Sequence, residues 1–163
     1  MSAEITVFLP RLPKRGIWPW SRRTWTAAEL NREIAAAGFD MRLDDFRPET
    51  QTGYVPCTIQ GVRSGFEFYS DSIEEYLSLV DEMRDDGDFP YSDADLELVK
   101  RHASVVQLST HWRPREYAAA AVAAACLAKM TGGTVLDEPP WKWYAGDAAI
   151  AWARKAVATP DAE

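Results

Sequence analysis

The stretch SVVQLSTHWRPREYAAAAVAAACLAKMTGGTVLD, residues 104–137, decides the fold. It begins with a run rich in β-forming residues over 104–109, which predicts a strand. Pro114 follows at a favoured first helical position. From there to Met130 the pattern predicts one helix, with seven alanines among residues 118–125. A strand, a long helix and a second strand are therefore expected in succession.

The end of this helix and the return of the chain are also marked in the sequence. Gly132 and Gly133 provide the left-handed residue that ends many helices, and residues 134–137 predict a short strand. A helix built of alanine has a smooth surface, so it can approach a sheet closely, although its methyl groups bury little apolar area per residue. We expect close packing, more than the burial of large side chains, to hold it in place.

Local signals outside this stretch predict the remaining elements. Thr26 and Glu29 form a capping-box pattern that begins a helix over 27–37, and Gly38 follows where such a helix ends. Strands are expected at residues 4–9, 39–44, 54–60 and 65–70, the last two as a hairpin whose link holds Gly61 and Gly65. Three further helices are expected: one from the cap Ser72 to about Arg84, a short one carrying Leu96 and Val99, and one over 147–157. Residues 138–144 are expected to form a loop rich in Pro and Trp.

The order of these elements predicts the fold class. The strands occur in consecutive, hairpin-like runs and do not alternate strictly with helices, which favours an α+β fold over a doubly wound one. We predict a single α+β domain over residues 1–163, with a mixed or largely antiparallel sheet of about five to six strands covered by helices. Residues 10–25 are expected to form a basic, Trp-rich loop, and residues 158–163 a frayed tail.

Composition narrows the possible functions. The chain has 25 acidic and 18 basic residues, a formal net charge of −7, and 47% hydrophobic residues. A negative chain is repelled by the phosphate backbone, so direct nucleic-acid binding is disfavoured. The start of the chain lacks a signal-peptide pattern, no stretch predicts a membrane span, and Cys57 and Cys126 lie in apolar segments as buried free thiols would. We expect a cytoplasmic protein.

The chain offers few groups for catalysis. His102 and His111 are its two histidines, and His102 is expected to cap a helix C-terminus, where a cation suits the dipole. His111 follows a strand with Glu116 five residues on, but no nucleophile motif accompanies it. Metal-ligand spacings, phosphate loops and dinucleotide glycine patterns do not occur. We therefore predict a protein that is not an enzyme and carries no metal and no cofactor.

An acidic segment is the first candidate binding surface. Eleven acidic residues fall between Asp71 and Glu97, against the single base Arg84. Such a run commonly forms a solvated helical face. It can also dock a basic partner, because complementary charge raises the association rate and selects the partner. The predicted contacts in this segment are Asp85, Asp86, Asp88, Asp93 and Asp95.

Aromatic residues in predicted loops are the second candidate. Trp18, Trp20, Trp25 and Trp112 occur outside periodic segments, and Trp141, Trp143 and Tyr144 form a late cluster. Large aromatics in loops often pin those loops to the core, but Trp and Tyr also dominate interface hot spots. We predict that Trp141, Trp143 and Tyr144 contact a partner beside the acidic segment.

The second half of the chain resembles a known group of proteins. The segments that carry this resemblance are residues 104–109, the Ala-rich helix ending in Thr131-Gly-Gly-Thr134, the Trp141-Lys-Trp143 segment and the closing helix. Their layout resembles that of small bacterial immunity proteins encoded beside polymorphic toxins, in particular the Imm52-like group. The resemblance covers about a third of the chain. It implies a protein without catalytic activity that binds a cognate toxin and blocks its active site or the entry of its substrate.

These observations lead to one predicted function and two alternatives. We predict a non-catalytic binding protein, an immunity protein that neutralises a cognate secreted bacterial toxin with a basic surface, for which a nuclease is a natural candidate. The first alternative is a small hydrolase-type enzyme centred on His111 and Glu116. The second alternative is a self-associating scaffold protein, which would form a homo-oligomer.

Overall fold

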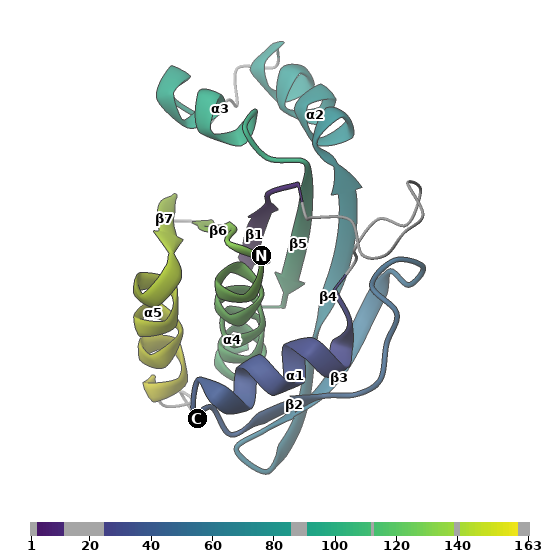
Figure 1. The fold of residues 1–163 in the computed structure, drawn as a ribbon, viewed down its shortest axis with the longest axis vertical. Coiled ribbons are helices and arrows are strands. Elements are labelled where there is room, and N and C mark those ends of the chain that lie inside the picture. Colours follow the sequence, from purple (N-terminus) through teal and green to yellow (C-terminus); the bar gives the residue numbers. More distant parts are fainter. Residues whose placement is uncertain (1–2, 12–24, 86–90, 112, 139–140, 160–163) are drawn as a thin grey trace, which may run out of the picture.

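The computed structural model contains a seven-stranded sheet in which every neighbouring pair is antiparallel (Figure 1). It describes residues 3–11, 25–85, 91–111, 113–138 and 141–159. The strands lie in the order β2-β3-β4-β5-β1-β6-β7. Their bounds are β1 Ala3–Leu9, β2 Met41–Leu43, β3 Gly53–Ile59, β4 Val62–Ser72, β5 Ser104–Thr110, β6 Thr134–Glu138 and β7 Lys142–Ala145. The predicted α+β fold is confirmed, with one strand more than the upper number expected.

The five helices of the described residues begin and end where local signals place them. They are α1 Ala27–Ala36, α2 Ile73–Asp85, α3 Asp93–Val99, α4 Pro114–Thr131 and α5 Gly146–Ala158. The capping box of Thr26 and Glu29 is formed, and Gly132 ends α4 with a positive φ of 74°. Residues 12–24 of the predicted Trp-rich loop and residues 160–163 of the predicted tail lie outside the described residues.

Helix α4 forms the centre of the larger core. Every residue from Ala118 to Ala128 is buried. The helix crosses one face of the sheet, with α5 on one side of it and α1 on the other (Figure 1). The inward side chains of β1 on this face include Ile5 and Val7, both fully buried. The alanine methyl groups thus let α4 lie close to the sheet and to two helices at once, as the sequence predicts.

A smaller core forms on the opposite face of the sheet. Helices α2 and α3 lie over one end of that face (Figure 1), and their apolar side chains pack on Phe8, Val105 and Leu136 of three adjacent strands. Phe8 contacts the ring of Tyr76 edge-on at a centroid distance of 5.4 Å. This helical pair therefore covers only part of the second face.

Two local predictions need correction. The link between β3 and β4 is only the two residues Gln60 and Gly61, with φ of 50° and 75°, as the positive φ values of a tight hairpin turn require. Gly65, expected in the link, is inside β4 and pairs with Pro56. Residues 142–144, expected as loop, belong to the edge strand β7, which pairs with β6.

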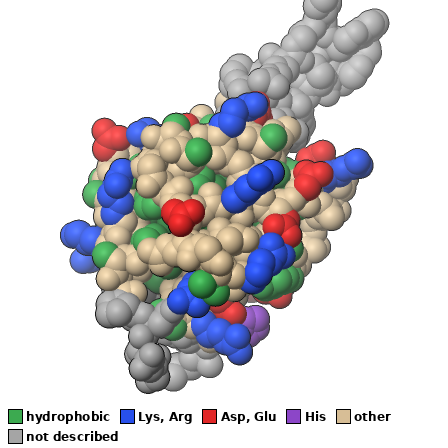
Figure 2. All heavy atoms as spheres, turned by 90° about the horizontal axis from the view of Figure 1, so that it is seen from below, with side chains coloured by type: hydrophobic (Ala, Val, Ile, Leu, Met, Phe, Trp, Pro, Cys, Tyr) green, Lys and Arg blue, Asp and Glu red, His purple; other side chains and the backbone are tan. Residues whose placement is uncertain are grey.

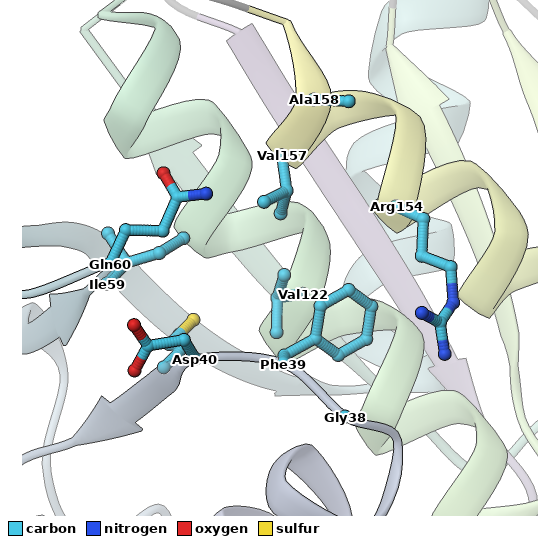
Figure 3. Close-up of a pocket in the computed structure, with 10 residues that line it drawn as sticks. Gly38, Phe39, Asp40, Ile59, Gln60, Val122, Arg154, Val157 and Ala158 are labelled. Carbon is cyan, nitrogen blue, oxygen red and sulfur yellow. The ribbon is translucent and has the colours of Figure 1, made fainter.

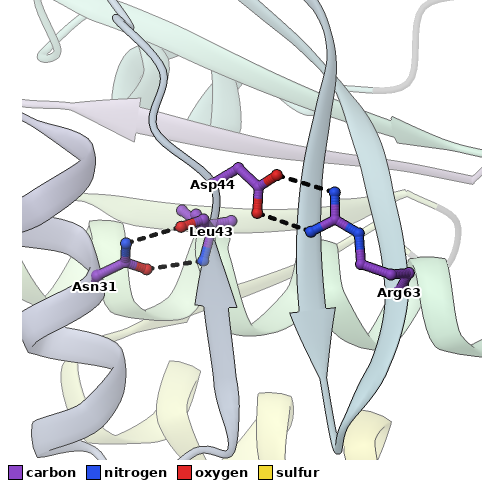
Figure 4. A network of polar contacts seen from close by, with 4 residues as sticks. All are labelled: Asn31, Leu43, Asp44 and Arg63. Carbon is purple, nitrogen blue, oxygen red and sulfur yellow. Dashed lines mark hydrogen bonds and ion pairs between the residues drawn. The ribbon is translucent and has the colours of Figure 1, made fainter.

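The opposite edge of the sheet is fixed by side chains. Asn31 on α1 donates to the carbonyl of Leu43 at 3.0 Å and accepts from its N–H at 2.8 Å (Figure 4). The guanidinium of Arg63 on β4 donates two hydrogen bonds to the carboxylate of Asp44, at 2.8 and 2.9 Å (Figure 4). The Asn31 contacts satisfy the outward backbone groups of Leu43, and the short length of the three-residue strand β2 limits edge pairing with other chains.

Candidate functional site

One row of side chains crosses five adjacent strands on the face that α2 and α3 cover only in part. The strand registers pair Tyr54 with Glu67, Glu67 with Ser109, Ser109 with Glu4, and Glu4 with Glu138. Directly opposed residues of antiparallel strands project to the same face with Cβ atoms about 5 Å apart. We call these five residues the polar row.

The next row along the strands lies between the polar row and the helical cover. It consists of Tyr69, Gln107, Thr6, Leu136 and Trp143. Only Leu136 and Trp143 of this row belong to the apolar cluster under α2 and α3, and no residue of the polar row does. The polar row thus lies at the border of this apolar cluster, where Glu4, Glu67, Ser109 and Glu138 are half-buried and Tyr54 is exposed.

Three carboxylates of the polar row are held by neutral donors. Gln107 Nε2 donates to Glu4 at 2.5 Å, the Thr6 hydroxyl donates to Glu138 at 3.1 Å, and the Tyr69 hydroxyl donates to Glu67 at 3.5 Å. All three donors come from the neighbouring row. The donors orient the carboxylates but do not cancel their charge.

None of these three carboxylates has an ion-pair partner among the described residues. Other acids of the chain do: Asp44 pairs with Arg63 at 2.8 Å and Asp147 with Lys129 at 3.2 Å. Burial and, next, the neighbouring charge of Glu4 together raise the pKa of Glu138 to about 7, against the lowering effect of the Thr6 hydrogen bond. The polar row thus concentrates negative charge that the described part of the chain leaves uncompensated.

Two tyrosines border this charge. Tyr54 is 57% exposed and Tyr69 is 43% exposed, although both have large apolar rings. The ring of Tyr54 lies over Gly65, where an added Cβ would be 2.4 Å from the Tyr54 Cζ atom. The missing side chain at Gly65 therefore allows the Tyr54 ring to lie along the sheet surface beside Glu67.

Of the predicted acidic contacts that the structure describes, Asp95 has a structural role. Asp85 is the last residue of α2, while Asp86 and Asp88 lie outside the described residues. Asp93 is exposed in the first turn of α3. Asp95 accepts from Ser92 in a capping box and from Trp143 Nε1 at 2.9 Å, which lowers its pKa chiefly through the Ser92 hydroxyl. Asp95 therefore stabilises α3 and links it to β7.

The predicted aromatic contacts differ in exposure. Trp141 is 41% exposed, has a positive φ of 61°, and contacts the ring of Tyr91 edge-on. Trp143 is half-buried against Phe8. Tyr144 is half-buried and stacks on Trp152 of α5 with ring centroids 5.1 Å apart. Trp141 is the member of this cluster with the most free surface, and the other two join β7 to the cores.

The early tryptophans can be placed only in part. Trp25 is buried and contacts the rings of Phe46 and Phe68 edge-on, as an aromatic that pins a loop to the core would. Trp18, Trp20 and Trp112 lie outside the described residues.

The histidines are arranged as follows. The His102 Nδ1 atom lies 2.9 Å from the Leu98 carbonyl, at the end of α3, in agreement with the capping interpretation. His111 Nδ1 is 3.7 Å from the Glu116 carboxylate, but the His111 side chain is 73% exposed. Glu116 also accepts from the His111 backbone N–H at 3.0 Å and lies 3.9 Å from Arg113. Glu116 therefore ties the residues before α4 to its first turn, while the imidazole of His111 is largely exposed to solvent and not enclosed.

A buried carboxylate joins β6 to two helices. Asp137 accepts from the Tyr117 hydroxyl at 2.7 Å and from Trp152 Nε1 at 3.2 Å. Burial raises its pKa, and the two hydrogen bonds act in the opposite direction. Because both donors come from the helices that pack on the larger core, Asp137 has a structural role between β6, α4 and α5. The alternation of the strand did not reveal it.

The described residues also line an open cavity of about 420 Å³ between the α1–β2 connection, the end of β3, α4 and α5 (Figure 3). Phe39, Val122 and Val157 supply apolar walls, and Asp40 and Gln60 lie at one side (Figure 3). The Arg154 guanidinium donates to the Ala37 carbonyl at 2.7 Å and lies 5.4 Å from the centre of the Phe39 ring. Its charged group is thus engaged with the chain itself, and the cavity presents no converging reactive groups.

The end of the molecule seen from below carries basic and acidic side chains interspersed with apolar ones (Figure 2). Mixed charge of this kind is typical of an ordinary solvated surface. No group of three or more His, Cys, Asp or Glu side chains within the described residues is arranged to hold a metal ion.

None of the helices in the described ranges is long and apolar enough to span a bilayer. No protein-family model, curated protein or solved structure matches this chain.

Proposed function

We propose that this chain is a non-catalytic binding protein, an immunity protein that neutralises a cognate secreted bacterial toxin with a basic surface in the cytoplasm. The observation that carries the proposal is the polar row, whose three carboxylates have no cationic partner among the described residues. A formal net charge of −7 adds to the attraction of a basic protein. The layout of residues 104–157, which resembles immunity proteins, points to the same class.

A basic toxin is the kind of partner that these charges favour. An enzyme that cleaves nucleic acid needs a positive surface around its substrate groove. A negative surface of matching extent is attracted to that groove over distances of about 10 Å at moderate salt and raises the association rate. An inhibitor that associates quickly protects the cell before much substrate is cleaved.

The proposal is tested by co-expression with the toxic C-terminal domain encoded by the neighbouring reading frame. Growth of cells that express this domain should be restored by the chain, and the two purified proteins should form a stable complex whose association slows with added salt. A neighbouring reading frame without a toxic product, or toxicity that persists when the chain is present in excess, would refute the proposal.

A further inference from the structure

We propose that the polar row, together with Tyr69, is the surface that binds the partner, and that its occupant is a protein segment presenting two or more arginine or lysine side chains. The inference rests on the proposed function and assigns it to a surface. It differs from the surface expected from the sequence, which is the acidic segment between Asp71 and Glu97.

The spacing of the carboxylates defines what the partner must present. Adjacent strands of a sheet are about 4.8 Å apart. Glu4 and Glu138 are on adjacent strands, and Glu67 is two strands from Glu4. The three carboxylates are therefore spread over about 15 Å in one line across the strands. A basic segment lying across the strands can meet them with cationic side chains about 5 to 10 Å apart.

The tyrosines provide the apolar part of the same surface. Tyr54 and Tyr69 flank Glu67 and are the exposed aromatic rings of β3 and β4. Arginine side chains stack on tyrosine faces as well as pairing with carboxylates. Rigid, amphipathic rings beside unpaired charges are the composition of interface hot spots. An occupant rich in arginine would use both kinds of contact at once.

The state of Glu138 supports a cationic occupant. Its pKa is raised by burial and by Glu4, while Asp137 adds a smaller repulsion from the adjacent position in the chain. Tyr76 of α2 and Tyr91 before α3 are the titratable groups that approach it from the helical side, and both are neutral near pH 7. A cation placed beside Glu138 would favour its ionised form. Binding should therefore strengthen between about pH 6 and 8.

The test compares two variants that carry the same charge change. One neutralises the row in the triple substitution Glu4→Gln, Glu67→Gln and Glu138→Gln. The matched control neutralises the exposed face of α2 in the triple substitution Glu74→Gln, Asp81→Asn and Glu82→Gln. Each removes three negative charges from the formal −7. Binding of a fluorescent arginine nonapeptide is measured by anisotropy at several salt concentrations and at pH 6 and 8, after circular dichroism has confirmed folding.

We expect the row variant to bind the peptide at least about tenfold more weakly, and the α2 variant less than about twofold more weakly. Amide resonances of β1, β4 and β5 should shift when the peptide is added to the wild-type protein. Equal losses in both variants would show that only net charge matters. A larger loss in the α2 variant would assign binding to the acidic segment, and both results would overturn the inference. If the row variant does not fold, Glu67→Lys alone replaces it.

Two further outcomes separate this inference from the function itself. If wild type and the row variant restore growth of toxin-expressing cells equally well, the surface is wrong and the function stands. If the wild-type protein fails to restore growth, the proposed function is refuted, whether or not the polar row binds the peptide. A solution mass that doubles with concentration for wild type, but not for the row variant, would identify a second copy of the chain as the occupant and refute a basic partner.

Discussion

Replacing Glu138 by glutamine should stabilise the protein at high pH and leave its stability nearly unchanged at low pH. The side chain of Glu138 is largely buried beside Glu4, and burial together with the charge of Glu4 raises its pKa from 4.5 to about 7. Glutamine keeps an oxygen that can accept the hydrogen bond from the Thr6 hydroxyl, whose donor distance to Glu138 is 3.1 Å. The substitution therefore removes the charge with little change in shape.

The sign and size of the effect follow from the direction of the shift. A folded-state pKa above the unfolded value means that Glu138 contributes stability below about pH 4.5 and that this contribution is lost as the pH rises through 7. Each pKa unit corresponds to about 1.4 kcal/mol, so the loss reaches about 3 kcal/mol at most above pH 8. The glutamine variant does not undergo this loss.

Urea denaturation of both proteins at pH 4.5, 6, 7 and 8.5 measures the prediction. The difference in the free energy of unfolding, variant minus wild type, should be close to zero at the lowest pH and rise to about 2 to 3 kcal/mol at the highest. Glu82→Gln, an equal charge change at an exposed position of α2, should give a difference within about 0.5 kcal/mol throughout. A constant difference for Glu138→Gln at all pH values would refute the reasoning that burial and Glu4 disfavour its charge.

Three more predictions concern the scaffold. Gly65→Ala should lower the free energy of unfolding by about 1 to 3 kcal/mol in urea denaturation, because its Cβ would be 2.6 Å from the backbone carbonyl oxygen of Val55 and 2.4 Å from Tyr54 Cζ. Unchanged stability would contradict this close approach. Asp137→Asn should destabilise by a similar ~1 to 3 kcal/mol in the same assay, because an amide oxygen cannot replace both acceptor oxygens used by its two donors; an effect below about 0.5 kcal/mol would show that these bonds matter little. The thiols of Cys57 and Cys126, whose pKa values burial raises to about 11 and about 12, should not react with a disulfide reagent at pH 8 until the protein unfolds; rapid labelling of the native protein would refute their burial.

Local sequence signals were sufficient for the helices and for six of the seven strands. The capping box at Thr26, the proline that begins α4 and Gly132 at its end each act within one or two turns, so the signal and the structure occupy the same residues. The prediction of a loop at β7 was wrong because two prolines and a tryptophan precede this strand, and such residues are typical of loops. In the structure this tryptophan, Trp141, has a positive φ. Pairing with β6, a tertiary effect, makes it a strand.

The candidate site could not be predicted in the same way. Alternation along residues 4–9 and 104–109 indicates that each strand has a polar face, but it does not say which carboxylate lies opposite which. Glu4 meets Ser109 and Glu138 only through registers that join positions more than 100 residues apart in the chain. The sequence instead drew attention to acids that are neighbours in the chain. Of these, Asp95 is engaged in capping α3 and binding Trp143.

The energetics of the second sheet face favour a binding role for the half-buried polar row at the border of the apolar cluster. Phe8 and Leu136 are buried under α2 and α3 on this face, and under such a cover apolar side chains are more stabilising than carboxylates. Glu138 is instead kept where burial and Glu4 make its charged form costly at neutral pH. A residue that weakens the isolated fold is typical of a surface selected for an interaction, because a cationic partner recovers the lost free energy on binding. The stability of Glu138→Gln and its affinity for a basic partner should therefore change in opposite directions.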